Sequence, residues 1–250
     1  MNIYETSHLL CEYLLFHYGA PAEVLPWDFG PEGALNFAIR AVSETFDPLP
    51  EGARALDVGC AVGRSSFELA RHCSEVIGID FSHRFIETAT KLKETGAIAY
   101  ERVDEGSLKT RLTALVPEDL DRTRVQFEVG NAMALREDLG TFDAVLAANL
   151  ICRLTEPRRF LDRLADLVRP GGQLVITTPG TWMVEFTPHD HWLGGLERDG
   201  VRVTTLDGLR ETLDPAFEFQ RARDLPFLIR EHARKFQWSV AQATVWRRKA

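Results

Sequence analysis

The sequence predicts an α/β fold in which a mixed sheet of seven strands carries helices on both faces, with a helical cap at the N-terminus. Two patterns predict this fold. From residue 53 onward, short apolar runs alternate with amphipathic stretches, which is typical of successive βα units around a mainly parallel sheet. The first apolar run ends in a glycine-rich turn that opens onto a helical stretch. At 250 residues, with 45% hydrophobic and 26% charged residues, the chain is predicted to form one globular domain.

The elements follow in order along the chain. An N-terminal helix is expected at 3–18, because Leu10, Tyr13, Leu14 and His17 share one face and Pro21 follows. A second helix is expected at 35–46. The stretch at 96–123 is ambiguous: its sequence is compatible with a strand at 98–103 and a helix at 106–115. The other predicted elements are strands at 53–58, 75–79, 125–129, 142–148, 173–178, 217–224 and 240–247, the last one antiparallel, and helices at 63–72, 83–95 and 157–167.

Two aromatic-rich segments, 181–195 and 227–238, follow predicted strands and are expected to be loops rather than strands. In open sheets of this kind, ligands bind beyond the carboxyl ends of the strands. Both segments are therefore expected over a ligand site at that edge. The domain then divides into a helical cap at 1–50, a ligand-binding core at 51–179, and site loops with C-terminal strands at 180–250.

Composition excludes several kinds of partner. The formal net charge of −8 argues against nucleic acid. No stretch approaches 18 consecutive apolar residues, so no membrane-spanning helix is expected. The four cysteines lie far apart and are expected to be reduced thiols of a cytoplasmic protein. His189 and His191 lack a nearby third ligand, so no metal is expected.

The sharpest motif runs from Asp57 to Ser65 and reads Asp-Val-Gly-Cys-Ala-Val-Gly-Arg-Ser. Gly59 and Gly63 suit a turn where the backbone approaches a ligand closely and adopts angles barred to residues with a Cβ atom. The N–H groups at the start of the following helix can bind a carboxylate or another anion. Because the spacing is G-x-x-x-G and not G-x-G-x-x-G, a dinucleotide site is disfavoured.

A second motif ends the next strand, where Asp80 is followed by Phe81. A carboxylate there can accept hydrogen bonds from two ribose hydroxyls, and Phe81 can lie against an adenine ring. Three further segments follow in order, at 130–132, 143–149 and 167–175.

Together these segments resemble the class I S-adenosylmethionine-dependent methyltransferases over residues 53–178. The resemblance implies a Rossmann-like fold, S-adenosylmethionine as cofactor and S-adenosylhomocysteine as product. It puts the glycine turn against the methionine end of the cofactor, Asp80 on the ribose and Asn131 against adenine. Asn131 replaces the acid usual in the family, but its side-chain carbonyl can still accept from the adenine amino group. The predicted cofactor-binding residues are Asp57, Gly59, Cys60, Ala61, Gly63, Arg64, Ser65, Asp80, Phe81, Ser82, Asn131, Ala132 and Asn149.

The flanks of this core carry a closer resemblance. With them, nearly the whole chain is similar to the 4-mercaptohistidine N1-methyltransferase domain of ovothiol biosynthesis, here expected to stand alone. The resemblance implies methyl transfer to the imidazole nitrogen nearer the side chain of 5-thiohistidine, giving ovothiol A. A pathway partner is then expected to supply the thiohistidine. The segments that carry it are 4–5, 12–19, 147–154, 181–182, 185–188, 192–195, 226–231 and 234–239.

A thiohistidine zwitterion carries a carboxylate, an ammonium group and a flat, soft ring. Arg153, Arg230 or Arg234 can bind the carboxylate through a forked guanidinium. Glu185 or Glu12 can pair with the ammonium group, and aromatic side chains can stack on the ring. The predicted substrate-binding residues are Glu12, Tyr13, Asn149, Arg153, Trp182, Glu185, Phe186, Arg230, Phe236 and Trp238.

No catalytic base is assigned, since a neutral imidazole already carries a free electron pair and alignment can supply the main effect. Histidines 17, 189, 191 and 232 are candidates for selecting the reactive tautomer. Two alternatives stay open: a methyltransferase for another small acceptor, such as a carboxylate, phenol or amine, and a non-catalytic module that binds S-adenosylmethionine and regulates a partner.

Overall fold

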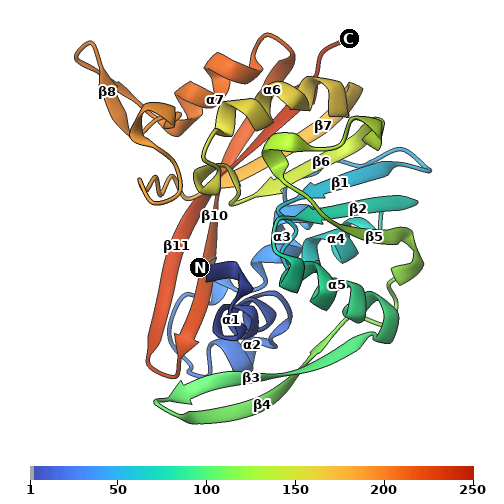
Figure 1. Cartoon of the computed structure of the whole chain (residues 1–250), viewed down its shortest axis with the longest axis vertical. Helices are drawn as coiled ribbons and strands as arrows, with labels where there is room; N and C mark the ends of the chain where they lie inside the picture. The colour runs from blue at the N-terminus through green and yellow to red at the C-terminus, as the bar shows by residue number, and fades with distance from the viewer. Residues whose placement is uncertain (1–2) are drawn as a thin grey trace.

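The computed structural model describes residues 3–250, which form a seven-stranded sheet with helices on both faces and two small hairpins (Figure 1). The strand order is β10–β11–β7–β6–β1–β2–β5. The last strand, β11, is antiparallel to β7 and β10, and the four pairs from β7 to β5 are parallel, as predicted. The strands are β1 Arg54–Val58, β2 Glu75–Asp80, β5 Val125–Val129, β6 Phe142–Ala148, β7 Val168–Thr178, β10 Phe217–His232 and β11 Lys235–Arg248.

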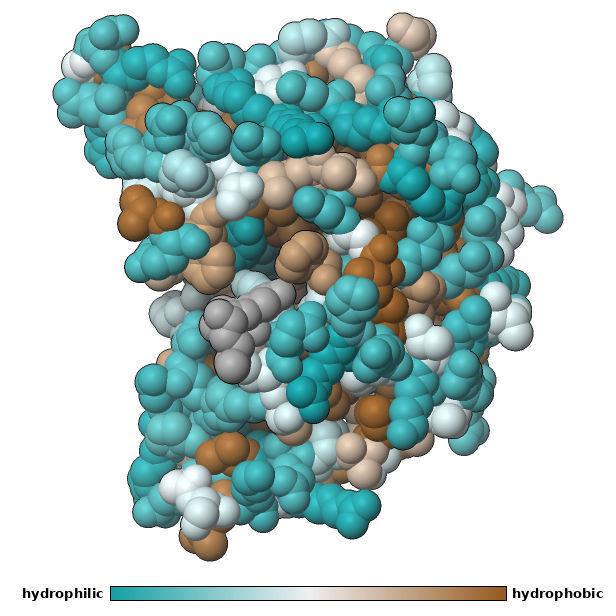
Figure 2. All heavy atoms as spheres, in the orientation of Figure 1, coloured by the Kyte–Doolittle hydropathy of each residue, from teal (hydrophilic) through white to brown (hydrophobic). Residues whose placement is uncertain are grey.

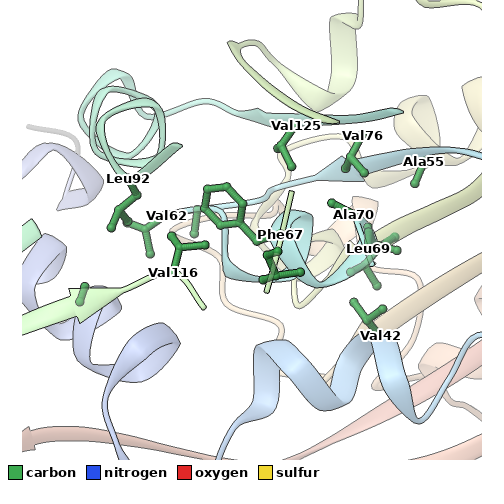
Figure 3. Close-up of a cluster of buried hydrophobic side chains, with 14 of the residues drawn as sticks. Val42, Ala55, Val62, Phe67, Leu69, Ala70, Val76, Leu92, Val116 and Val125 are labelled. Carbon is green, nitrogen blue, oxygen red and sulfur yellow. The ribbon is translucent and has the colours of Figure 1, made fainter. Parts of the chain in front are cut away.

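Successive side chains of each strand point to opposite faces of the sheet, and both faces are covered. One face includes Ala55 of β1 and Val76 of β2, and packs against α3, α4 and α5 (Figure 3). The other face includes Leu56 and Ile77, and packs against α6 and α7. These helices are α3 Phe37–Ser43, α4 Arg64–Leu69, α5 His83–Thr95, α6 Pro157–Leu167 and α7 Thr205–Leu213.

The N-terminal cap lies beside the sheet and consists of η1 (Ile3–Glu5), α1 (Ser7–Tyr18), α2 (Pro21–Val24), η2 (Glu32–Ala34) and α3. Thr6 begins α1 by accepting a hydrogen bond from the Leu9 N–H at 3.3 Å. Leu14 and Leu15 are buried against the first core. The two predicted cap helices are therefore present, the first preceded by a 3₁₀ turn and the second shorter than predicted.

Residues 106–115, whose sequence is compatible with a helix, form a turn and a strand instead. Strands β3 (Ala97–Glu105) and β4 (Leu108–Leu115) form an antiparallel hairpin, joined at Gly106, whose φ is 56°. The possible strand at 98–103 is thus present. Two residues between alternating strands, one of them a glycine at positive φ, are a hairpin signal.

The loop expected at 227–238 is wrong, because most of this segment lies on strands. Strands β10 and β11 pair continuously across this region and extend well beyond the part of β11 that pairs with β7. Figure 1 shows this long hairpin reaching past α1 and α2 toward β3 and β4. Pro226 is tolerated because β10 is the edge strand of the sheet. Arg230, Phe236 and Trp238 therefore lie on strands.

The remaining elements connect these layers. They are η3 Arg122–Arg124, η4 Ala132–Ala134, η5 Glu137–Leu139, η6 Ile151–Arg153, η7 His189–His191, β8 Leu196–Arg198 and β9 Val201–Val203. Within residues 3–250, no helix is long and apolar enough to cross a membrane. In the same range, no group of three or more histidine, cysteine, aspartate or glutamate residues could hold a metal ion.

Candidate cofactor and acceptor site

The glycine turn has the backbone conformation that its sequence predicts. Gly59 and Gly63 have φ angles of 78° and 84°, in the left-handed region, and Ala61 between them has a φ of 48°. The Gly59 and Cys60 N–H groups both donate to the carbonyl of Ile79 in β2, at 2.7 and 3.1 Å. The turn is therefore fixed directly to the strand that carries Asp80.

The space beside each glycine is filled by the protein itself. A Cβ atom on Gly59 would lie 3.0 Å from the Leu150 side chain, and one on Gly63 would lie 2.5 Å from the Phe127 ring. The lack of a side chain at Gly59 and Gly63 is therefore explained by these contacts within the protein, and not by the close approach of a ligand. The N–H groups of the turn at 59–61 are also engaged, since Gly59 and Cys60 donate to Ile79 and Ala61 donates to Asp80.

Asp57 at the end of β1 is completely buried. Its Oδ2 accepts hydrogen bonds from the hydroxyls of Ser65 and Ser66, at 2.8 and 2.7 Å. Its Oδ1 is buried without a partner in the described structure. Burial raises the pKa of the Asp57 carboxyl to about 6, against the two serine hydrogen bonds that lower it. One carboxylate oxygen is therefore available to a donor that the protein does not supply.

The raised pKa of Asp57 gives folding a specific pH dependence. Between about pH 4 and pH 6 the folded protein binds a proton at Asp57 that the unfolded chain has released. The free energy of unfolding should therefore fall as the pH rises through this window. Asp57→Asn should remove this slope. Urea unfolding of both proteins at several pH values checks it, and equal slopes would show that Asp57 does not titrate there.

Asp80 ends β2 and organises the neighbouring loops. Its Oδ2 accepts from the Ala61 N–H at 2.9 Å and its Oδ1 from the Ser82 N–H at 2.9 Å. Burial raises its pKa, and these backbone hydrogen bonds oppose the rise. Ser82 in turn begins α5, where its hydroxyl accepts from the Phe85 N–H at 3.1 Å. The acid predicted to bind ribose thus joins the glycine turn to α5.

Exposed apolar side chains lie next to this acid. Phe81 is 63% exposed, and Val129, at the end of the neighbouring strand β5, is 43% exposed. Ala132 is buried beside them, and Asn131 begins η4 by accepting from the Met133 N–H at 2.9 Å. The Asn131 carbonyl expected to face adenine therefore already has one partner, and its second lone pair remains for a ligand.

The remaining predicted cofactor residues are fixed by the protein. Arg64 is buried in an ion pair with Glu68 at 3.0 Å. Asn149 has a φ of 53°, and its Oδ1 accepts from the Thr177 hydroxyl at 2.9 Å. Cys60 is buried.

Comparison with known proteins shows what this part of the chain resembles. Residues 56–176 match the family model described as a methyltransferase domain. This region is therefore similar to a methyltransferase domain, and the chain has the Rossmann-like fold of the class I methyltransferases. The match spans the glycine turn, Asp80 and Asn131, the segments on which the sequence resemblance depended.

Two relatives are methyltransferases by name. The chain is 30% identical over 165 residues to the 2-methyl-6-phytyl-1,4-hydroquinone methyltransferase of Synechocystis, covering 65% of this chain and 42% of that protein. It is 27% identical over 150 residues to the ubiquinone biosynthesis O-methyltransferase of Cereibacter sphaeroides, covering 58% and 51%. The chain thus spans about half the length of the curated relatives it matches.

A solved structure shares the fold over nearly the whole chain. The [4+2]-cyclase SpnF superposes with a TM-score of 0.61 at 18% identity, covering 99% of this chain and 95% of that one. That protein is named for a cyclisation, so the shared fold does not fix the reaction.

The residues around the turn fit S-adenosylmethionine. The unpartnered Oδ1 of Asp57 can accept from the α-ammonium group of the methionine end. Asp80 can accept from the ribose hydroxyls, and the exposed Phe81 offers an apolar surface to adenine. The bound cofactor would supply an electrophilic methyl group on its sulfonium.

Of the predicted acceptor residues, Arg153 lies in η6, just after β6. Its guanidinium carbon lies 4.6 Å from the centre of the Phe186 ring, and Nη1 donates to the carbonyls of Cys152 and Thr181 at 3.0 and 3.2 Å. Among residues 3–250, no carboxylate lies within ion-pair distance of Arg153. Figure 2 shows the molecule hollowed at mid-height on this view, with both apolar and polar side chains around the hollow.

Tyr13 lies within electrostatic reach of both Arg153 and Asp80. Burial raises the pKa of the Tyr13 hydroxyl, and the charges of Asp80, Arg153 and Glu12 also act on this pKa. Glu12 faces Glu231 and Lys235 of the long hairpin, and burial raises its pKa. The structure therefore brings four predicted residues together: Asp80, Tyr13, Arg153 and Phe186, with Glu12 beside them.

Other predicted acceptor residues have different neighbours. Arg230 is 4% exposed and donates to the Glu23 carbonyl at 2.8 Å, while its Nη2 lies 3.8 Å from Asp104 of β3. It joins the long hairpin to α2 and β3, with Phe236 next to it. Trp238 is 62% exposed on β11.

Trp182 was expected over the site, but it is buried. Its indole donates to the Thr205 hydroxyl at 2.9 Å and stacks on Trp192. The indole therefore belongs to the second core rather than to an open face. Glu185, in the same loop, is exposed.

His17 is partly buried, and burial lowers the pKa of its ring to about 3, so the ring is neutral. Its Nδ1 has no partner in the described structure, and the ring stacks on Tyr13. Its place beside Tyr13 is compatible with the tautomer-selecting role considered for it.

Sequence reasoning gave no role to several residues of this site. Tyr18 donates its hydroxyl to the Val62 carbonyl at 2.8 Å and so attaches α1 to the glycine turn. Ser66 shares Asp57 with Ser65. Tyr4 and Glu5 reach the start of α5. Of these, Tyr18 and the Tyr4-Glu5 pair stood out in the sequence, as parts of the closer resemblance.

Proposed function

We propose that this protein methylates a small molecule, and that its acceptor is 5-thiohistidine, giving ovothiol A and S-adenosylhomocysteine. One observation carries the proposal: Arg153, half-buried and without an acidic partner in residues 3–250, lies within electrostatic reach of Tyr13, which also feels the cofactor acid Asp80. An amino-acid acceptor brings the carboxylate that such a guanidinium binds well.

The rest of the acceptor has suitable neighbours. Glu12 supplies a half-buried carboxylate for the ammonium group. Phe186 and Tyr13 supply aromatic faces for the ring. The four cysteines are free thiols, which suits a cytoplasmic setting. A partner enzyme there would supply the thiohistidine.

The reaction needs little acid or base chemistry. Bound S-adenosylmethionine would supply the methyl group to the lone pair of the neutral imidazole nitrogen and would become S-adenosylhomocysteine. The extra ring proton would leave to water. The protein contributes alignment of nitrogen, carbon and sulfur, and exclusion of water.

The test is turnover of 5-thiohistidine with S-adenosylmethionine, with the product analysed by mass spectrometry and NMR. We expect one added methyl group on the ring nitrogen nearer the side chain. A panel containing histidine, a hydroquinone, a carboxylic acid and an amine serves as comparison. Methylation of the hydroquinone alone would replace the proposed acceptor, in line with the names of the relatives. Cofactor binding without any product would favour a regulatory module.

Arg153→Ala should raise the KM for 5-thiohistidine about 10- to 100-fold, because a charge-assisted hydrogen bond contributes about 1.5–3 kcal/mol. The dissociation constant of S-adenosylmethionine should change little. Arg158→Ala, which removes a partly exposed arginine of α6 paired with Glu211, is the matched control and should leave both constants unchanged. An unchanged KM in Arg153→Ala would remove this arginine from acceptor binding.

A further inference from the structure

The segment from Tyr4 to Glu5 is fixed to the beginning of α5. The Ser82 hydroxyl donates to the Tyr4 carbonyl at 3.0 Å. The Glu5 carboxylate accepts from the His83 N–H at 3.0 Å and from the Arg84 N–H at 3.4 Å, and Arg84 Nη1 donates to the Glu5 carbonyl at 3.1 Å. A carboxylate at the start of a 13-residue helix is stabilised by the N–H groups that the helix leaves unpaired.

This attachment directs the Tyr4 side chain toward the acceptor site. Its ring contacts Tyr13 and Phe85 edge-on, with centroids 6.3 and 6.0 Å away. Its hydroxyl is within hydrogen-bonding reach of Arg153 and feels the charge of Asp80. Tyr4 therefore lies between the acid that faces the cofactor and the arginine that faces the acceptor.

We propose that Tyr4 is a specificity-determining residue that binds the acceptor's carboxylate together with Arg153, and that Glu5 is the positioning residue that fixes Tyr4 in place. This inference rests on the proposed function, because it requires an acceptor with a carboxylate.

The chemistry of the pair supports this assignment. Burial raises the pKa of the Tyr4 phenol, so it keeps its proton at neutral pH. A protonated phenol can accept from a guanidinium and donate to a carboxylate, so Tyr4 and Arg153 can bind one carboxylate jointly. When a phenol and a guanidinium bind the same carboxylate, the site discriminates better against an acceptor that lacks a carboxylate, because both side chains would then lose a partner.

The test compares two acceptors: 5-thiohistidine and the corresponding thiol-imidazole ethylamine, which lacks the carboxylate. Tyr4→Phe should raise the KM for 5-thiohistidine about tenfold or more, and should leave the KM for the amine and the dissociation constant of S-adenosylmethionine unchanged. Glu5→Ala should raise the same KM less. Glu5→Gln should restore most of it, because an amide oxygen still accepts from the helix N–H groups.

Tyr100→Phe is the matched control, since it removes a buried hydroxyl without a partner on β3, away from the site. It should leave all three constants unchanged. If Tyr4→Phe leaves the KM for 5-thiohistidine unchanged or lowers it, or raises the KM of both acceptors equally, the assignment is wrong. If the unmutated protein does not methylate 5-thiohistidine at all, the proposed function has failed instead, and calorimetry with S-adenosylmethionine shows whether the cofactor site is intact.

Discussion

Asp80→Ala should weaken S-adenosylmethionine binding by about 3 kcal/mol, more than a hundredfold, since each hydrogen bond to a charged group contributes about 1.5–3 kcal/mol. Two kinds of effect add here: the cofactor loses a direct contact, and two backbone N–H groups lose their hydrogen-bond acceptor. The ribose loses its acceptor, and the Ala61 N–H loses the carboxylate that fixes the glycine turn. The Ser82 N–H at the start of α5 loses its partner as well. Calorimetric titration of both proteins with S-adenosylmethionine measures the change.

A second ligand separates the two effects. S-adenosylhomocysteine lacking both ribose hydroxyls should bind the unmutated protein much more weakly than S-adenosylhomocysteine does. Asp80→Ala should discriminate little between these ligands. If the mutant still discriminates as strongly, the ribose does not lie on Asp80. Asp80→Asn, which keeps the side-chain shape, repeats the comparison if the alanine protein does not fold.

Gly63→Ala should lower the free energy of unfolding by about 3 kcal/mol in the absence of cofactor. The φ of 84° costs a residue with a Cβ atom about 1–2 kcal/mol. The added methyl would also lie 2.5 Å from the Phe127 ring, and such overpacking costs about 1–3 kcal/mol. The ring cannot retreat easily, because it packs edge-on against Phe67 and lies over Gly78 as well.

Gly52→Ala is the matched control for Gly63→Ala. Gly52 has a φ of 74°, but nothing lies within 4 Å of its added methyl. Its cost should therefore be the backbone part alone, about 1–2 kcal/mol. Urea unfolding measures both. Equal costs at the two positions would contradict the role of Phe127. Adding Phe127→Leu to Gly63→Ala should relieve part of the loss, which a double-mutant cycle detects.

The parallel core could be predicted from the sequence because its signals are local. The runs that form β1, β2 and β6 are apolar and short, and each is bounded by glycine or a polar residue, so strand type and order along the chain follow directly. The positive φ angles at Gly59 and Gly63 follow from the same local reasoning. The side chains that fill the space beside those glycines could not be predicted from local sequence, because Leu150 and Phe127 come from distant segments.

The β3–β4 hairpin and the outer part of the β10–β11 hairpin were not fully predicted, for different reasons. At β3 and β4 the period-two alternation and the turn at Gly106 were present but weak, because most side chains there are only partly buried. At β10 and β11 the proline and the polar residues resembled a loop. Only the edge position of β10 makes Pro226 acceptable, and that position depends on the whole sheet.

The acceptor site depends on long-range contacts that no spacing encodes. Arg153 and Arg230 are equally plausible carboxylate ligands in the sequence. The structure distinguishes them, because Arg230 is buried against Glu23 and Asp104, whereas Arg153 lies near Tyr4, Tyr13 and Asp80. Glu5 likewise reaches the start of α5 from a distant part of the chain.

The central claim is that the turn at 59–63 and the acid at position 80 bind S-adenosylmethionine with its methyl group facing Arg153. A crystal structure with S-adenosylhomocysteine tests this most directly. The account predicts ribose hydroxyls on the Asp80 carboxylate, adenine beside Phe81 and Asn131, and the sulfur toward Tyr13 and Arg153. A nucleoside bound elsewhere on the chain, or in this place with its sulfur turned away from Arg153, would contradict it.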